Sequence, residues 1–484
     1  MQLLICALLP VALGGLISLL RNAKRGLRMT VALLSACLTS AFVGYLAFTD
    51  GGERYELFRL TDQFVFALRL DGAGRVYIGL AAALWPLSVL YAIEYMRHEK
   101  REGNFFSWYL IAYGAAVLLA AADNLFTLYI SYELLTLFTV PLVWHAQDDA
   151  STKAALQYML YLIGGAALGF MAMLGLSGFG LGEFTGNAAL PEGADMAWFR
   201  ALCMLGFLGF GVKAAVLPLS RWLPVASVAP TPVTALLHAV AVVNAGVFAV
   251  TRFFYYAVPM DALRNTWVQT AMLILSAATV LFASAMAVRE QHLKRRLAWS
   301  TVSNLSYMLL GLSLMTEQGM AAGLSHMVFH GLMKIILFFC AGAVLTQTGR
   351  TQARQTYGLG RQMRVTFCAF TIAGLSLMGV PPLPGFVSKY ALVTAAFSME
   401  NTWAFIGGIA LLVSAVLTCI YIFTVVFPAY FLQPVRSGET DQPHDPGPCM
   451  KISLVLLCLL LIAAGVFAGR IMDDLTALAE GGIV

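Results

Sequence analysis

Long apolar runs separated by short polar segments dominate the chain. About fourteen of them reach the roughly 20 residues that a helix needs to cross a membrane. They start near Met1, Arg28, Gly72, Asn104, Asn124, Ala154, Arg200, Pro230, Trp267, Leu297, Met320, Val365, Thr402 and Met450. The first run lacks a basic start and a small-residue cleavage site, so we interpret it as a retained helix and not as a signal peptide. The pattern predicts an all-α integral membrane protein.

Two connections between these runs are long. Residues 50–71 are acidic and are expected to hold a short strand or hairpin on the outer side. Residues 433–450 are rich in Pro and polar residues, which predicts a flexible inner link before the last helix.

Composition and charge support a membrane location. The 484 residues are 60% hydrophobic and only 11% charged, whereas soluble domains carry about 25% charged residues. Most Lys and Arg residues, including Lys294, are expected in loops on one side, whereas fewer, including Arg252, are expected on the other side. This bias places the first set of loops inside and both termini outside. The net charge of +5 reflects this loop bias, so it does not indicate nucleic acid. The expected location is the cell (inner) membrane, with multiple passes.

The sequence shows no motif for redox, hydrolytic or nucleotide chemistry. The eight cysteines form no CxxC pair and lie mostly in apolar runs, where they are expected to pack helices. No phosphate loop or dinucleotide fingerprint is visible. We therefore predict no cofactor and no metal site. The pattern does not decide whether the chain is a transport subunit of a redox-driven enzyme complex or of an antiporter complex.

Two proline-rich stretches interrupt helical runs. "GVKAAVLPLSRWLPVASVAPTP" contains Pro218, and "GLSLMGVPPLPGFVSKYAL" contains Pro381, Pro382 and Pro384. Unpaired backbone at membrane depth is tolerated only against protein or a wet cavity, and paired interruptions mark the ion or substrate site of many transporters. The alternative for either stretch is an ordinary proline kink.

Seven titratable side chains fall deep inside apolar runs. His326, His330 and Lys334 are spaced i, i+4 and i+8, so they share one face of a helix. The remaining four are Glu133, Lys213, His238 and Lys389. Four chargeable groups at mid-membrane would cost about 10–14 kcal/mol if unpaired. We therefore expect them to pair with one another or to line water.

The favoured interpretation of this set is a relay for protons or cations, because buried lysines and histidines can exchange protons near neutral pH. For His238 the alternative is a packing residue, and for Glu133 it is a structural hydrogen bond. The pattern disfavours haem, because two histidines on one face of one helix cannot take opposite axial positions on a single haem. A metal site would need nearby carboxylate or Cys partners, and none is apparent.

Six motifs in order make the resemblance to a known family specific. They are "YELLTLFTVPLV", "FGVKAAVLPLSRWLP", "APTPVTALLHAVAVVNAGVF", "LKRRLAWSTVSNLSYMLLGL", "LSHMVFHGLMKIILFFCAGAV" and "GVPPLPGFVSKYAL". From about residue 71 to 431 the sequence resembles the antiporter-like membrane subunits of respiratory complex I, energy-converting hydrogenases and Mrp-type Na⁺/H⁺ antiporters. It is most similar to the short, D-type form, which lacks a long lateral helix.

The resemblance implies about fourteen transmembrane helices with two inverted five-helix repeats, each holding one broken helix. The expected divisions are residues 1–103 (helices one to three), 104–252 (first repeat), 266–432 (second repeat) and 450–484 (last helix). In the family, the Glu at position 133 pairs with Lys213. His326, His330 and Lys334 link that pair to Lys389, and protons enter through one half and leave through the other.

One residue departs from the family pattern. Many relatives have a lysine where this chain has Asn244. Either His238 replaces that step or the central link is weaker.

The resemblance implies a proton- or Na⁺/H⁺-translocating subunit that works with other membrane subunits, lipids, H⁺ and, as the second candidate ion, Na⁺. The alternative function is a membrane partner that couples proton flow to a separate enzyme, such as a bicarbonate-uptake protein. A third is an inactive scaffold, against which the intact Glu133, Lys213, Lys334 and Lys389 argue.

Overall fold

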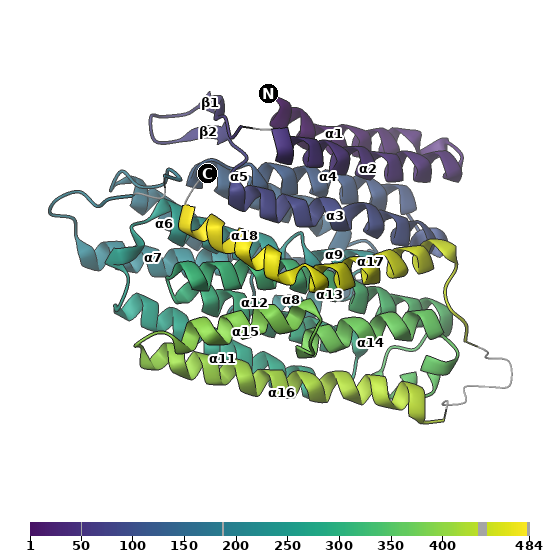
Figure 1. The fold of residues 1–484 in the computed structure, drawn as a ribbon. Helices are drawn as coiled ribbons and strands as arrows, with labels where there is room; N and C mark the ends of the chain where they lie inside the picture. The colour runs from purple at the N-terminus through teal and green to yellow at the C-terminus, as the bar shows by residue number, and fades with distance from the viewer. Residues whose placement is uncertain (50, 186–187, 434–442, 482–484) are drawn as a thin grey trace.

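The computed structural model describes residues 1–49, 51–185, 188–433 and 443–481. These are almost entirely helical, and the long helices run side by side along one direction (Figure 1). Eleven helices within the described ranges are long and apolar enough to cross a membrane. The α-helices are α1 (Gln2–Leu19), α2 (Arg25–Thr49), α3 (Gly72–Tyr95), α4 (Glu102–Ala120), α5 (Leu125–Val143), α6 (Asp149–Ser177), α7 (Met196–Gly211), α8 (Trp222–Ala226), α9 (Thr231–Ala239), α10 (Val243–Arg252), α11 (Trp267–Arg289), α12 (Leu293–Ser313), α13 (Glu317–Thr348), α14 (Arg364–Met378), α15 (Pro384–Phe397), α16 (Thr402–Phe431), α17 (Pro448–Val466) and α18 (Ala468–Gly481).

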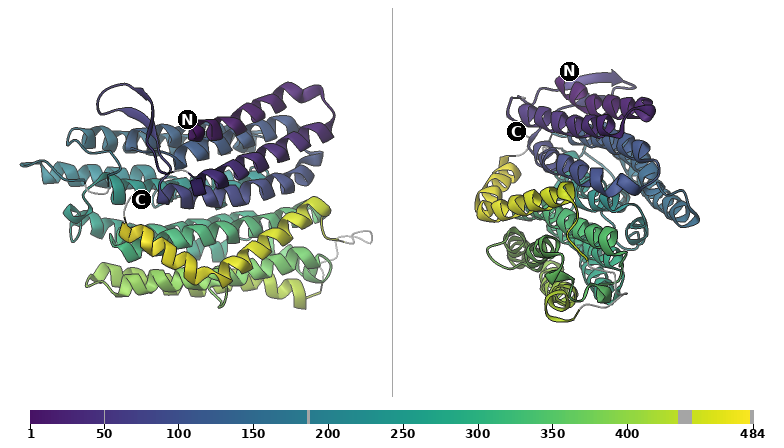
Figure 2. Two further views of the ribbon diagram at one scale, coloured as in Figure 1. Left: turned by 45° about the horizontal axis from the view of Figure 1, so that its top comes forward. Right: turned by 90° about the vertical axis from the view of Figure 1, so that its right-hand side faces the viewer.

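The helices form successive layers from one flank to the other (Figure 2). Helices α1 and α2 lie on one flank and pack on α4 and α3, whereas α11 and α16 lie on the opposite flank. Small residues allow the first layers to approach closely, since a Cβ at Gly14 of α1 would lie 2.8 Å from the carbonyl oxygen of Ser107 in α4. The middle of the bundle is occupied by α13.

Helix α13 is the most deeply buried of the uninterrupted helices among the candidate membrane spans of the described ranges, and only the interrupted α9–α10 span is more buried. The most apolar window of α13 is 89% buried. The helix begins where the Thr316 side chain accepts a hydrogen bond from the Gly319 amide at 3.0 Å. It ends at Gly349, whose φ of +67° suits glycine. These two features fix the ends of a helix of 32 residues, and His326, His330 and Lys334 lie near its middle.

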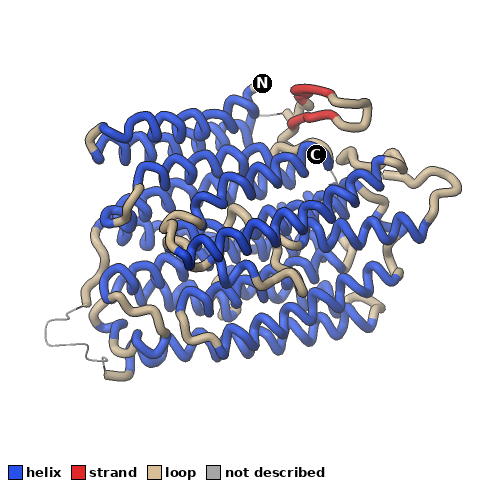
Figure 3. The backbone as a smooth tube through the Cα atoms, turned by 180° about the vertical axis from the view of Figure 1, so that it is seen from behind, coloured by secondary structure: helices blue, strands red, loops and turns tan. Residues whose placement is uncertain are grey.

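A two-stranded hairpin stands at one end of the bundle (Figure 3). Strand β1 (Tyr55–Arg59) pairs antiparallel with β2 (Val65–Leu68), so the hairpin expected between residues 50 and 71 is present. The start of α1 and the end of α18 lie at the same end of the bundle as this hairpin (Figure 1).

The segment near the opposite end is only partly described. Residues 434–442 of the expected flexible link lie outside the described residues. In the part that follows, the Asp445 carboxylate accepts hydrogen bonds from the amides of Val365 and Thr366, both at 3.0 Å. Asp445 therefore satisfies free amides at the start of α14.

Candidate ion-translocation site

The first interruption contains Lys213 and Pro218. Helix α7 stops at Gly211 and α8 starts at Trp222, so the residues between them leave carbonyl groups without helical partners. The indole of Trp222 donates to the Val212 carbonyl at 2.9 Å. The hydroxyl of Tyr132, from α5, donates to the Phe210 carbonyl at 3.0 Å. Side chains thus satisfy the opened backbone inside the bundle.

Lys213 is fully buried beside α5. Its ammonium donates to the Tyr132 carbonyl and lies 3.3 Å from the centre of the Tyr132 ring. Glu133 is the next residue of α5, and its side chain is only partly buried. Among the described residues no ion pair joins Glu133 to Lys213, although their charges interact electrostatically. The family resemblance implies that Glu133 pairs directly with Lys213. In this structure the Lys213 ammonium contacts Tyr132, the residue next to Glu133, instead.

The second interruption separates α14 from α15 and contains Pro381, Pro382 and Pro384. Helix α14 ends at Gly379, whose φ of +96° suits glycine. Lys389, on α15, donates to the Leu377 carbonyl at 2.6 Å, one of the groups freed at the end of α14. A cavity of about 210 Å³ lies beside Lys389 between α15 and α16. It is lined in part by exposed side chains such as Tyr390, so it reaches the flank of the chain.

A third interruption, between α9 and α10, was not expected from the sequence. Residues 240–242 leave the helix, and the Asn244 amide group donates to the Ala239 carbonyl at 2.8 Å. Tyr77 donates to the Ala241 carbonyl at 3.1 Å. No proline lies at this point, which is why the sequence pattern missed it. Asn244, with an amide that can replace a lost backbone donor, was the available signal.

The first and third interruptions lie against each other. A Cβ at Gly246 of α10 would collide with the backbone of Lys213 and Ala214. On the other side, a Cβ at Gly331 of α13 would lie 2.8 Å from the Ala239 carbonyl oxygen. Glycines therefore bring the Lys213 segment, the α9–α10 interruption and α13 into direct backbone contact.

Helix α13 carries His326, His330 and Lys334 on one buried face. The rings of His326 and His330 are 6.1 Å apart. Lys334 donates to the Leu297 carbonyl at 3.2 Å and to the Ser300 hydroxyl. Both ring nitrogens of His330, and both of His238 on α9, are buried without a hydrogen bond to described protein atoms. We refer to Glu133, Lys213, His238, Lys334, His330, His326 and Lys389 as the buried polar row. Both ring nitrogens of His238 and His330, and Oε1 of Glu133, are therefore atoms of this row that described protein atoms leave unsatisfied.

A polar face of α12 links the members of this row. Ser300 contacts Lys334, and the Asn304 side-chain oxygen is 3.1 Å from Nε2 of His326. The Tyr307 ring stacks on His326 with centroids 5.4 Å apart, and Lys389 Nζ lies 5.2 Å from the centre of the same ring. Nδ1 of His326 is 2.9 Å from the hydroxyl of Ser388, next to Lys389. Sequence reasoning missed this face, although the i, i+4, i+7 spacing of its three residues could have shown it.

The sequence led us to expect that the buried charges either pair with one another or line water, and the three central lysines, Lys213, Lys334 and Lys389, make no direct ion pair within the described part of the chain. Their ammonium groups donate to backbone carbonyls, together with one hydroxyl. Carbonyls are available because the interruptions and the ends of helices free them.

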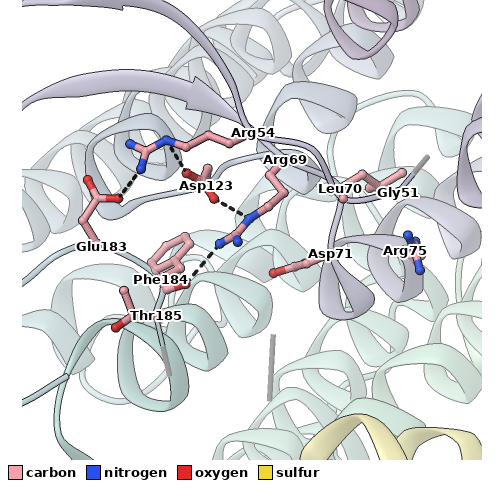
Figure 4. A pocket seen from close by; sticks show the side chains of 11 residues that line it. Gly51, Arg54, Arg69, Leu70, Asp71, Arg75, Asp123, Glu183, Phe184 and Thr185 are labelled. Carbon is pink, nitrogen blue, oxygen red and sulfur yellow. Dashed lines mark hydrogen bonds and ion pairs between the residues drawn. The ribbon is translucent and has the colours of Figure 1, made fainter. Parts of the chain in front are cut away.

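A polar pocket of about 610 Å³ lies at the hairpin end of the bundle (Figure 4). Asp123 is held there between Arg69 at 2.5 Å and Arg54 at 3.1 Å, and Arg54 also reaches Glu183 at 3.3 Å. Burial raises the pKa of Asp123, while Arg69 and Arg54 act in the opposite direction. Asp71 also lines this pocket.

Two basic residues that the sequence placed in loops are buried instead. Arg252 was assigned to an outer loop, but it is the fully buried end of α10 and forms a two-pronged ion pair with Asp71. Lys294 was assigned to an inner loop, but it is 8% exposed and donates to the Ala229 carbonyl at 2.7 Å. Charge near the end of an apolar run does not by itself distinguish a solvated residue from a buried one.

These features define a multi-pass membrane protein with interrupted helices and a buried polar row at its centre. The sequence profile of the NADH:quinone oxidoreductase/Mrp antiporter transmembrane family matches residues 122–418. The chain belongs to this family, and it is a multi-pass protein of the cell membrane.

Curated relatives are larger than this chain. NADH-quinone oxidoreductase subunit L of Mycobacterium tuberculosis is 32% identical over 413 residues, which cover 85% of this chain and 64% of the relative. Na⁺/H⁺ antiporter subunit A1 of Staphylococcus haemolyticus is 29% identical over 435 residues, covering 85% and 53%. The chain thus spans less than two thirds of the length of these proteins.

Solved structures share the fold across the whole chain. A chain of the archaeal membrane-bound sulfane sulfur reductase matches with a TM-score of 0.87 and 22% identity, covering 99% of this chain and 97% of that one. A chain of respiratory complex I from Thermus thermophilus matches with a TM-score of 0.84 and 24% identity, covering 99% and 98%.

Proposed function

We propose that this chain is the ion-translocating subunit of a multisubunit membrane complex and that H⁺ moves along its buried polar row. The observation that carries the proposal is the row itself. Three helix interruptions and the polar face of α12 bring its lysines and histidines, from different helices, into one succession through the bundle. Buried ionisable groups in membrane helices are costly, so a continuous series of them indicates a pathway.

The proposed order starts at Glu133 and Lys213 and passes the α9–α10 interruption at His238. It continues through Lys334, His330 and His326 on α13 and ends at Lys389. The close approach of α10 to the Lys213 segment, the neighbouring rings of His326 and His330, and the Ser388 hydroxyl beside Lys389 support parts of this order. The ammonium groups are held by neutral carbonyls and hydroxyls, whereas an ion pair would hold each lysine in its charged form. The ring nitrogens of His238 and His330 bond to no protein atom in the described ranges, which leaves them available to accept a proton from water.

The two ends of the row support assembly with other membrane subunits. Glu133 is partly exposed on the flank of α5, and the cavity beside Lys389 opens on the flank of α15 and α16. A carboxylate exposed to lipid at mid-helix is unfavourable. A neighbouring subunit is therefore the better partner for the flank of α5 that carries Glu133. Relatives include subunits of an NADH-quinone oxidoreductase and of an Na⁺/H⁺ antiporter, which makes Na⁺ the second candidate ion.

The finer architecture is part of this proposal. We infer about fourteen spans, in which α7–α8, α9–α10, α14–α15 and α17–α18 each count as one. The two five-helix repeats are residues 104–252 and 266–432, preceded by 1–103 and followed by 450–484. Both termini are placed outside, with the hairpin, because the basic loops lie at the other end. The bicarbonate-uptake alternative gains no support from the relatives.

The test is proton flux in vesicles that contain the purified complex, driven by an imposed potassium diffusion potential and followed with a trapped pH-sensitive dye. Glu133→Gln keeps the shape of the side chain and removes its charge, so flux should fall to the background of empty vesicles while the complex assembles. Flux at the wild-type rate in Glu133→Gln would contradict the proposal. Repeating the assay with and without Na⁺ identifies the ion.

A further inference from the structure

Lys294 differs from the two basic residues that follow it in α12. Arg295 is largely exposed and pairs with Glu290 at 3.2 Å. Arg296 is buried but donates to the Tyr421 carbonyl of α16 at 3.1 Å. Lys294 instead reaches the segment before α9, where it donates to the Ala229 carbonyl. It is a buried titratable group that the row described above does not use.

A polar line continues from this contact into the bundle. The Ala229 carbonyl that accepts from Lys294 also accepts from the Thr234 hydroxyl at 3.0 Å. Thr234 and His238 are four residues apart on α9, so they lie on the same face. Both ring nitrogens of His238 are buried without a hydrogen bond to described protein atoms. The line from Lys294 therefore ends at an unsatisfied member of the row.

The charges around Lys294 connect it to an exposed surface. Glu99, an exposed residue between α3 and α4, attracts the Lys294 charge. His238 on α9 and His292 before α12 also interact with that charge. Lys294 thus stands between an exposed carboxylate and the centre of the bundle.

Building on the function proposed above, we propose that Lys294 is a second point of proton uptake, which delivers protons from the inner surface to His238. Both this point and the Glu133–Lys213 entry must load the row in each transport cycle, so loss of either one blocks flux. The ammonium of Lys294 releases a proton through intervening water to the Thr234 hydroxyl, which shares the Ala229 carbonyl with it, and from there to a ring nitrogen of His238. This leaves a neutral amine and an imidazolium. The amine then regains a proton from water at the inner surface near Glu99. The imidazolium passes its proton to the buried face of α13 that carries His326, His330 and Lys334.

The first test compares Lys294→Ala and Lys294→Arg with Arg295→Ala, a neighbouring control with an exposed side chain. Arginine keeps the positive charge and can donate to Ala229, but it does not release a proton at neutral pH. Proton flux in vesicles should fall about tenfold or more in both Lys294 variants and stay near wild type in Arg295→Ala. If Lys294→Ala fails to assemble, Lys294→Arg decides. Wild-type flux in Lys294→Arg would show that Lys294 only tethers the segment before α9.

The second test addresses the line between Lys294 and His238. Thr234→Val is nearly isosteric and removes the hydroxyl, whereas Thr234→Ser retains it. Flux should fall in the valine variant and persist in the serine variant, and equal flux in the two would contradict the route. Glu133→Gln is measured in parallel. If Glu133→Gln blocks flux while Lys294→Arg does not, only the uptake point is wrong; if Glu133→Gln conducts normally, the proposed function itself fails.

Discussion

The three central lysines are held in the same way, by neutral oxygen atoms. Each ammonium donates to a backbone carbonyl, from Tyr132, Leu297 or Leu377. The sequence identified these lysines because a charge stands out in an apolar run. It could not identify their partners, since a backbone carbonyl carries no residue-specific signal. The polar contacts of Lys213, Lys334 and Lys389 therefore became visible only in the folded chain.

Lys389 provides the sharpest prediction for a single residue. Lys389→Ala should abolish release at the far end of the row, and Lys389→Arg should not restore it, because arginine keeps its proton at any workable pH. Flux in vesicles measures both, and Lys153→Arg at the exposed start of α6 serves as the control. Wild-type flux in Lys389→Arg would show that this position is not protonated and deprotonated during transport.

A second prediction concerns the position where relatives have a lysine. Asn244 donates its amide to the Ala239 carbonyl, so it stabilises the interruption, whereas the ring nitrogens of His238 have no hydrogen bond to any described residue. His238→Ala should therefore reduce flux more than Asn244→Ala, measured per assembled complex. Asn244→Lys should restore part of the flux in His238→Ala. The opposite order of the two alanine variants would show that His238 does not carry the proton at this step.

At the scale of elements, prolines predicted two of the three interruptions. Pro218 and Pro381 mark positions where a helix cannot continue without losing a hydrogen bond. The α9–α10 interruption has no such residue, and it is held by contacts from Tyr77 and from its own Asn244. Tertiary contacts of this kind are not encoded by local pattern, so the sequence predicted a continuous helix there.

The polar face of α12 can be tested with two buried serines. Ser300 contacts Lys334, whereas Ser313 donates only to its own helix, to the Leu309 carbonyl at 2.7 Å. A hydrogen bond to a charged group contributes about 1.5–3 kcal/mol, so Ser300→Ala should lower flux about tenfold. Ser313→Ala should leave flux unchanged. Similar flux in the two variants would mean that α12 packs beside the row without taking part in it.

At the scale of the whole molecule, the buried Arg252–Asp71 pair joins α10 to the start of α3. Removing one partner leaves a buried charge without compensation, which costs about 3–5 kcal/mol. Arg252→Met should therefore lower the thermal unfolding midpoint in detergent, and Asp71→Asn in the same chain should restore part of the loss. Arg59→Ala in the exposed hairpin should change little. An unchanged midpoint in Arg252→Met would show that the pair does not hold these helices together.

The membrane class of the whole chain followed from hydropathy, and its family followed from the six motifs in order. The apolar runs correspond to helices throughout the described residues, since run length and composition determine membrane-spanning helices directly. Burial near the ends of runs was not predicted, as Arg252 and Lys294 show. Their positions depend on how neighbouring helices cover them, which hydropathy does not contain.

The most direct test of the account is proton flux through the complete complex when the centre of the row is removed. Lys334→Met keeps the length and packing of the side chain on α13 but cannot carry a proton, and Lys153→Met makes the same change at an exposed position. Flux should fall to the background of empty vesicles in Lys334→Met and remain at the wild-type rate in Lys153→Met. Equal, wild-type flux in both variants, with both complexes fully assembled, would contradict transport along this row.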